Sequence, residues 1–251
     1  MGKSLYNKVV IVSNGNIDPA ELRIINEKDF IICADGGANF LIETDITPNL
    51  IVGDLDSIDD EVHHHYKNKD CDFIEFDTEE DKTDTHLSLE YSLQNIICSE
   101  IVILGALGLR FDHTLANLHL LYNAKRDHDK LAEETGETHP LNIRIVSNAG
   151  EITVTDGTLK LQGEPGDLVS FIPLTDKVGK IECSGLKFPV TEKSLLHEDE
   201  SGLSNEMTDN EACITINEGI MMVVKKRKQS SDLLRINSGP APIFFTKPKG
   251  H

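Results

Sequence analysis

Four short segments of this chain combine aspartate with glycine, asparagine, threonine or arginine, and each follows an apolar, strand-like run and precedes a helix-like run. They are residues 34–39 (ADGGAN), 53–57 (GDLDS), 81–84 (DKTD) and 110–113 (RFDH). The strand ends of an open α/β sheet share one edge, and ligands bind in the crevice there, so we expect the carboxylates to converge. Such a cluster is costly unless cations neutralise it, and carboxylate oxygens suit Mg²⁺. The pattern therefore favours a magnesium-dependent enzyme that acts on phosphates.

The strongest candidates for metal ligands are Asp54 and Asp56, which flank Leu55. In an extended segment, residues i and i+2 face the same side, so both carboxylates could bind one ion. An Asp-x-Asp pair also occurs in ordinary acidic loops. It gains weight here because Asp35 and Asp84 are equivalently placed in other segments. The segment therefore predicts a metal site around Asp54 and Asp56, with Asp35 and Asp84 near it.

A glycine-rich turn after the second predicted strand could contact a nucleotide. Gly36 and Gly37 allow a ligand to approach the backbone closely, and Asn39 adds an amide that can form hydrogen bonds. The alternative is an ordinary turn in which Asp35 caps the local backbone. The chain contains neither a Walker A sequence nor a G-x-G-x-x-G sequence, so any nucleotide must be held in another way.

The two remaining segments offer a helix start and a guanidinium group. Asp81 and Thr83 open a predicted helix, where an aspartate is normally a cap but where phosphate also binds. Arg110 offers a fork of N–H donors to phosphate. Asp112 could accept a hydrogen bond from a polar substrate.

Composition limits the possible partners. The formal net charge is -19, which argues against nucleic acid and against an anionic membrane surface as partners. Five cysteines without C-x-x-C spacing argue against a disulfide framework or a zinc site. The chain shows no signal-peptide pattern and no apolar run near the ~20 residues of a membrane helix. We therefore expect a cytoplasmic protein that contacts no membrane.

Strand-like and helix-like runs alternate over residues 1–147. Strands are expected at residues 8–13, 30–34, 50–52, 72–76, 101–104 and 143–146, and helical segments at residues 38–44, 59–69, 83–97 and 113–125. The polar residues 126–140 are interpreted as a solvated helix extension and loop. This alternation is typical of a mainly parallel sheet with helices on both faces.

The pattern changes near residue 148, after which short strands alternate with turn residues. Asp156-Gly157, between the strand-like residues 151–155 and 158–162, predicts a β-hairpin. Residues 168–224 contain further short strands with little helical periodicity. We predict an α/β domain over residues 1–147 and an all-β sandwich domain over residues 148–251.

The four segments, in this order and spacing, resemble those of the thiamine pyrophosphokinase (thiamine diphosphokinase) family. The family pattern is close to A-D-G-G-A-N, G-D-L-D-S, D-x-T-D and G-x-R-F-D-H. Weaker similarities are residues 170–174 (SFIPL), 185–189 (GLKFP) and 203–206 (LSNE), so the resemblance covers about residues 9–224. Two positions depart from the family pattern: Leu109 stands where Gly is usual, and Ser88 stands where Ala is usual.

The resemblance implies a fold, a reaction and an assembly. Family members use ATP and Mg²⁺ to transfer a diphosphate to the hydroxyl of thiamine, which releases AMP. Residues 1–147 would bind ATP and magnesium, and residues 148–251 would bind thiamine and form a homodimer with active sites between the subunits.

The resemblance also assigns roles to residues by motif. Asp54, Asp56, Asp84 and Arg110 would be the catalytic group, and Asp35, Asp54, Asp56 and Asp84 would hold magnesium. The nucleotide would contact Asp35, Gly36, Gly37, Asn39, Ser57, Asp81 and Thr83. Thiamine would contact Asp112, Ser204 and Asn205, of which the last two could come from the partner subunit.

Two other functions fit the same residues. A magnesium-dependent phosphohydrolase would use the carboxylates to activate water. A non-catalytic nucleotide sensor would keep the glycine-rich turns and turn nothing over, and the acidic positions present in all four segments argue against it.

Overall fold

The structure is a computed structural model, and it describes residues 4–76, 82–108, 110–135, 141–188 and 193–228. Its first half alternates strands and helices. The strands are β1 Ser4–Leu5, β2 Lys8–Val12, β3 Phe30–Ala34, β4 Leu50–Gly53, β5 Asp72–Glu75, β6 Ile96–Ile97, β7 Glu100–Leu104 and β8 Asn142–Ser147. The helices are the 3₁₀ segments η1 Glu21–Ile24 and η2 Asp35–Phe40 and the α-helices α1 Asp60–Lys67, α2 Asp84–Asn95 and α3 Phe111–Thr135.

The second half consists of strands in the part of the chain that the structure describes. They are β9 Gly150–Thr155, β10 Thr158–Gln162, β11 Leu168–Pro173, β12 Lys177–Ser184, β13 Lys193–Leu196, β14 Asn205–Glu206, β15 Glu211–Thr215 and β16 Met221–Lys226.

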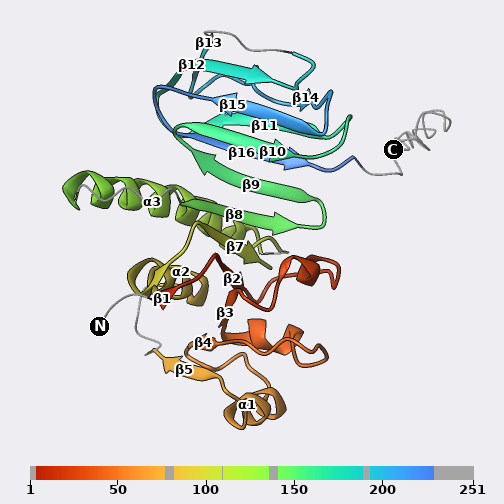
Figure 1. The fold of residues 1–251 in the computed structure, drawn as a ribbon, viewed down its shortest axis with the longest axis vertical. Coiled ribbons are helices and arrows are strands. Elements are labelled where there is room, and N and C mark those ends of the chain that lie inside the picture. The colour runs from red at the N-terminus through yellow and green to blue at the C-terminus, as the bar shows by residue number, and fades with distance from the viewer. Residues whose placement is uncertain (1–3, 77–81, 109, 136–140, 189–192, 229–251) are drawn as a thin grey trace, which may run out of the picture.

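One long sheet joins the two halves (Figure 1). Its ten strands follow the order β14-β11-β16-β9-β8-β7-β2-β3-β4-β5. Neighbouring strands from β8 to β5 are parallel, whereas β9, β16, β11 and β14 continue the sheet with antiparallel pairs. The carboxyl ends of the parallel strands therefore share one edge of the first half.

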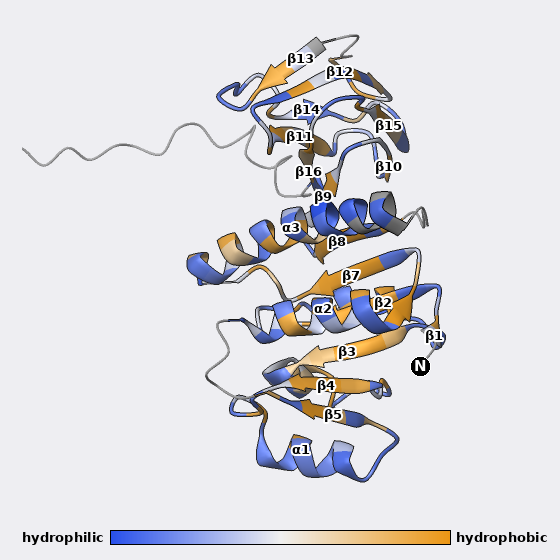
Figure 2. Ribbon diagram, turned by 90° about the vertical axis from the view of Figure 1, so that its left-hand side faces the viewer, coloured by the Kyte–Doolittle hydropathy of each residue, from blue (hydrophilic) through white to orange (hydrophobic). Residues whose placement is uncertain are grey.

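Helices cover both faces of the parallel strands. Val9 and Ile11 of β2 belong to a core that includes side chains of α2 and α3. Val10 and Val12 of the same strand pack with residues of η2 and α1. Alternate residues of a strand point to opposite faces, so β2 is buried on both sides. Figure 2 shows these strands mostly in hydrophobic colours and α1 largely in hydrophilic ones, and the predicted fold of this half is confirmed.

The second half is a β-sandwich, as predicted. β10, β15, β12 and β13 form a separate four-stranded sheet. Leu159 and Ile214 of that sheet share one hydrophobic cluster with Phe171 and Val223 of the long sheet. The two sheets are held together because their facing apolar side chains are removed from water.

The predicted hairpin at Asp156-Gly157 is wrong. β9 lies between β8 and β16, so both of its edges are occupied, and β10 pairs with β15 instead. The chain therefore passes from one sheet to the other at this turn. Lys125 of α3 holds the turn in place through an ion pair with Asp156, with Nζ 2.8 Å from Oδ1.

The polar segment after residue 125 extends a helix, as predicted, because α3 begins at Phe111 and ends at Thr135. The predicted domain boundary at residues 147/148 falls between β8 and β9, which are paired neighbours in the long sheet. The division into two domains remains a prediction. No helix within the described ranges is long and apolar enough to cross a membrane.

Candidate active site

Three predicted metal ligands meet at the carboxyl edge of the parallel strands. Asp35 follows β3, Asp54 follows β4, and Asp84 begins α2. One carboxylate oxygen from each lies within 4.8 Å of the others. We call these three residues the carboxylate trio. The strand ends bring them together although the first and last are 49 positions apart in the sequence.

Gly53 leaves the space in which two members of the trio meet. A Cβ atom on this residue would lie 2.8 Å from Cβ of Asp35 and 2.9 Å from Oδ1 of Asp84. Its φ of 155° is also one that side chains rarely adopt. Asp35 itself has a φ of 45°, which costs about 1 kcal/mol or more for a residue with a side chain. The chain therefore accepts local strain at the point where the trio forms.

The trio is buried enough to disfavour three negative charges. Asp35 is only 2% exposed. Its Oδ2 accepts a hydrogen bond from the backbone N–H of Ser57 at 3.0 Å, whereas its Oδ1 has no hydrogen-bond partner among the described residues. Burial raises the pKa of Asp35, against the opposing effect of the hydrogen bonds from Ser57 and Gly36. Burial, then the charges of Asp35 and Asp54, raise the pKa of Asp84 to about 6.

These properties fit a hard divalent cation. Three carboxylate oxygens at this spacing could share one ion, and the buried Oδ1 of Asp35 offers an unused acceptor. A cation would also remove the like-charge repulsion that raises the pKa of Asp84.

Asp56 lies outside the trio, although it was predicted to share the ion with Asp54. That prediction assumed an extended segment, but Leu55 has a φ of 62°, so the two carboxylates do not lie on one side of a strand. Asp56 is exposed, and its Oδ1 accepts a hydrogen bond from Oγ of Ser57 at 2.8 Å. Its charge nevertheless contributes to the raised pKa of Asp84.

The predicted nucleotide contacts that the structure describes are already hydrogen-bonded within the chain or are buried. The amide of Asn39 is occupied, since Nδ2 donates to the Ser57 carbonyl at 3.0 Å and Oδ1 accepts from the Asp59 backbone N–H at 3.1 Å. Thr83 is the N-cap of α2, and its hydroxyl accepts from the His86 backbone N–H at 3.3 Å. Gly36 and Gly37 are buried beside Asp35. Asp81 lies outside the described residues.

Arg110 and Asp112 pair with each other. Nη2 of Arg110 is 2.7 Å from Oδ2 of Asp112, and both side chains are largely exposed. The hydrogen bond from Arg110 is the main reason that the pKa of Asp112 falls to about 2. The Arg110 guanidinium is therefore already bound to the Asp112 carboxylate, and a phosphate would have to compete with that carboxylate for the guanidinium.

The residues predicted to bind thiamine from the second half lie at the other end of the long sheet. Asn205 belongs to β14, which is seven strand positions from β3, or roughly 30 Å at about 4.8 Å per strand. The Asn205 amide is buried and holds Phe188: Nδ2 donates to its carbonyl at 2.7 Å, and Oδ1 accepts from its N–H at 3.0 Å. Ser204 is exposed, and its backbone N–H donates to Oγ of Ser170 at 3.0 Å.

Sequence reasoning missed Phe188 and the loop after β2. The Phe188 ring is 62% exposed, and its backbone N–H and carbonyl are both held by the Asn205 amide. The loop at residues 13–17 also follows a buried strand at the carboxyl edge, but it lacks the aspartate by which the other loops were recognised. The strand-end position alone could have identified it.

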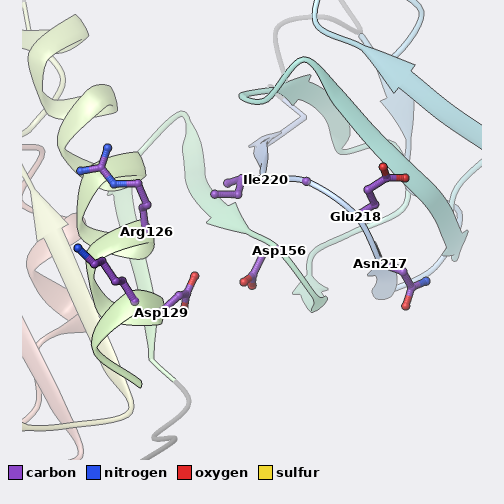
Figure 3. A pocket seen from close by; sticks show the side chains of 8 residues that line it. Arg126, Asp129, Asp156, Asn217, Glu218 and Ile220 are labelled. Atoms are coloured by element: carbon purple, nitrogen blue, oxygen red, sulfur yellow. The ribbon is translucent and has the colours of Figure 1, made fainter. Parts of the chain in front are cut away.

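A separate depression of about 430 Å³ lies between α3 and two turns of the second half (Figure 3). It is lined by Arg126, Asp129, Lys130, Asp156, Asn217, Glu218, Gly219 and Ile220. None of the predicted site residues belongs to it, and ion pairs from Lys125 and Lys177 already neutralise several of its carboxylates.

An acidic centre at the carboxyl edge of a parallel sheet, where open α/β sheets bind their ligands, fits an α/β enzyme. Comparison with known proteins narrows this class. The family model for the thiamin pyrophosphokinase catalytic domain matches residues 22–132, and the model for the vitamin B1 binding domain of the same family matches residues 156–221. The chain belongs to the thiamine pyrophosphokinase family.

Individual relatives agree with this assignment. The thiamine pyrophosphokinase of Bacillus subtilis is 24% identical over 219 residues, which cover 86% of this chain and 96% of that protein. Thiamine pyrophosphokinase 1 of rice, Oryza sativa subsp. japonica, is 34% identical over 111 residues, which cover 36% of this chain. The matches to rice proteins 1 and 3 span half or less of those proteins' length.

Solved structures show the same fold. The structure of the thiamin pyrophosphokinase from Geobacillus thermodenitrificans has a TM-score of 0.72 and 27% identity, and it covers 89% of this chain and 99% of that one. The structure of the enzyme from Bacillus subtilis has a TM-score of 0.75 and 22% identity and covers 89% of this chain and all of that one.

Proposed function

We propose that this protein transfers the diphosphate group of ATP to the hydroxyl of thiamine, with thiamine diphosphate and AMP as products. Membership of the family supports the reaction. The observation that carries the proposal is the carboxylate trio, which lies at the edge where an α/β sheet binds its ligands.

The trio would hold Mg²⁺, with Asp56 beside it. When bound, Mg²⁺ would neutralise charge on the phosphates and polarise their oxygens. The protein supplies the geometry: Ser57 fixes Asp35 through its backbone N–H, and Asn39 fixes the loop that carries Asp54 and Asp56 through two hydrogen bonds. Both residues would then act on the nucleotide chiefly by holding the ligands of the metal.

The transfer is a displacement at the β-phosphorus of ATP. The thiamine hydroxyl oxygen forms the new bond, the bond from that phosphorus to the oxygen bridging to the α-phosphorus breaks, and AMP leaves with the bridging oxygen. The hydroxyl proton passes to solvent. Holding the hydroxyl in line with the bond that breaks is worth on the order of 7–11 kcal/mol in favourable cases, so the site needs no dedicated general base.

A homodimer would bring the two halves of the site together. Within one chain, Phe188 and Asn205 lie roughly 30 Å from the trio, at about 4.8 Å per strand. Large apolar side chains are exposed near β14, at Phe188 and Leu203, and at the start of α3, at Phe111 and Leu115. Such exposure is typical of a protein–protein contact. We propose that the β14 edge of one chain faces the trio of a second copy.

We also propose that the enzyme works in the cytoplasm and that its partners are small molecules, ATP and thiamine. Cys33, Cys71, Cys98 and Cys213 form no disulfide bond, which suits a reducing compartment. The net charge of -19 leaves nucleic acid and anionic membranes without an electrostatic attraction to the surface.

An assay of AMP release with and without thiamine tests the proposal. We expect AMP only when ATP, Mg²⁺ and thiamine are all present, and none after chelation of the metal. A matched control is Asp60→Asn, which removes an exposed carboxylate of α1 and should leave the rate unchanged, whereas Asp54→Asn should abolish it. Phosphate release that needs no thiamine would identify a phosphohydrolase, and ATP binding without any product would identify a sensor.

A further inference from the structure

The topology of the parallel strands places a second ligand-facing loop beside the trio. From β2 the chain proceeds through β3, β4 and β5 on one side, and it then returns to β7 and β8 on the other side of β2. The order of strands therefore reverses between β2 and β7. In open α/β sheets the loops diverge at this point and ligands bind in the crevice between them. The loop at residues 13–17 follows β2 and lies at this reversal.

Two hydrogen bonds fix the start of this loop. The backbone N–H of Ser13 donates to the Leu104 carbonyl at 2.9 Å, which ties it to the end of β7. The Ser13 hydroxyl lies 2.9 Å from Oγ1 of Thr85 in a buried hydrogen bond, which ties it to the first turn of α2. The loop is thus rigidly joined to the element that carries Asp84.

Asn14 projects from this fixed point onto the glycine-rich turn. A Cβ atom on Gly36 would lie 2.7 Å from Cγ and 2.9 Å from Oδ1 of Asn14, so the amide rests directly on the residue after Asp35. Asn14 is exposed. The structure records no hydrogen bond from its side chain to the described residues, in contrast to Asn39, whose amide is occupied.

A neutral amide at this place has a chemical use. The trio repels a triphosphate until a cation is bound, and the triphosphate needs donors that add no further negative charge. An asparagine Nδ2 supplies two N–H donors, and hydrogen bonds to charged groups are stronger than those between neutral groups. We infer that Asn14 binds the phosphate chain of ATP and is a positioning residue for the proposed reaction, on which this inference rests.

The test measures nucleotide binding apart from turnover. ATP would be titrated with Mg²⁺ into wild type and Asn14→Ala by calorimetry, in the absence of thiamine. One lost hydrogen bond to a charged group predicts a Kd about tenfold or more higher for the variant. In steady-state assays KM for ATP should rise similarly while KM for thiamine and the melting temperature stay unchanged. A change of fold or loop structure would not produce this selective pattern.

Asn95→Ala is the matched control, because Asn95 is an exposed asparagine at the opposite end of α2 and should leave ATP binding unchanged. If the Kd of Asn14→Ala for ATP stays within twofold of the wild-type Kd, the inference is overturned and the proposed function still stands. A wild-type protein that binds no ATP would overturn both. An increase in KM for thiamine equal to that for ATP would also contradict the assignment to the phosphate chain.

Discussion

Oδ1 of Asp84 occupies the space that a side chain at residue 53 would need, since a Cβ atom on Gly53 would approach it to 2.9 Å. The missing side chain therefore lets the start of α2 come close to the end of β4. Asp35 fills the other side of the same space. The trio depends on this one glycine as much as on its own carboxylates.

Gly53→Ala should therefore impair both folding and activity. The new methyl group would collide with Asp35 and Asp84, and φ of 155° disfavours any side chain. We expect a loss of roughly 1–3 kcal/mol in the free energy of unfolding and a fall in kcat, measured by chemical denaturation and by the AMP assay. Gly157→Ala is the control, because a Cβ atom on Gly157 meets nothing within 4 Å. Equal behaviour of the two variants would contradict this account of Gly53.

Asp84→Asn should abolish turnover but stabilise the protein without metal at neutral pH. The pKa of Asp84 is raised to about 6 in the folded state, against about 3.9 in an unfolded chain. The folded state then binds this proton more tightly, so the contribution of Asp84 to stability is full below about pH 4 and is lost as pH rises through about 6. At pH 8 with a chelator the variant should gain roughly 1–2 kcal/mol, after allowance for solvent screening.

Denaturation at several pH values checks this prediction. The difference between variant and wild type should shrink toward zero at pH 4, and Mg²⁺ should raise the melting temperature of the wild type more than that of the variant. If the free energies of unfolding of the two proteins change with pH in parallel, Asp84 has an ordinary pKa and this prediction is wrong. A variant that keeps wild-type activity would reject Asp84 as a metal ligand.

Ser88→Ala should stabilise the protein. Ser88 is fully buried in α2, and its hydroxyl has no hydrogen-bond partner among the described residues. Removing an unsatisfied buried hydroxyl should raise the free energy of unfolding by about 1 kcal/mol. Ser92→Ala gives the opposite expectation at a matched position, because the buried Ser92 hydroxyl donates to the Ser88 carbonyl at 2.8 Å. If Ser88→Ala destabilises the protein instead, the Ser88 hydroxyl has a hydrogen-bond partner.

A shared active site predicts that two impaired chains complement each other. Asp84→Asn damages the trio, and Phe188→Ala removes an exposed ring at the other end of the long sheet, which should cost about tenfold in kcat/KM for thiamine. In a heterodimer with one chain of each kind, one of the two sites would be intact, so activity should return to about half of the wild-type value per dimer. A heterodimer purified through two different tags tests this. Activity no higher than that of the separate variants would mean that each site lies within one chain.

The sequence could predict the first half of the fold because strands such as β2 are continuous apolar runs, buried on both faces. It could predict the second half because short strands such as β10 alternate between buried and exposed residues. It could also predict that Asp35, Asp54 and Asp84 converge, since parallel strands end at one edge. The residues around Asp156-Gly157 could not show whether the two flanking strands pair with each other. Its turn residues are favourable, but the edges of β9 are taken by β8 and by β16, a strand about seventy positions further along the chain.

The hydrogen-bond partners of the side chains could not be predicted from the sequence either. The amides of Asn39 in η2 and Asn205 in β14 looked available for a ligand, yet both are used by neighbouring backbone groups. Asp56 lies outside the trio, and Leu55, which precedes it, adopts a left-handed φ in place of the expected extended one. These outcomes depend on backbone geometry at single residues, which residue types and spacing do not determine.

The most direct test of diphosphate transfer is to identify the product that receives the β-phosphorus of ATP. ATP labelled at the β-phosphorus would be incubated with the protein, Mg²⁺ and thiamine, and the products would be separated and counted. A diphosphate transfer predicts that the label appears in thiamine diphosphate and that AMP forms in equal amount, because the bond between the α- and β-phosphates breaks. Labelled ADP formed together with thiamine monophosphate would contradict this account and show an ordinary kinase that attacks the γ-phosphorus.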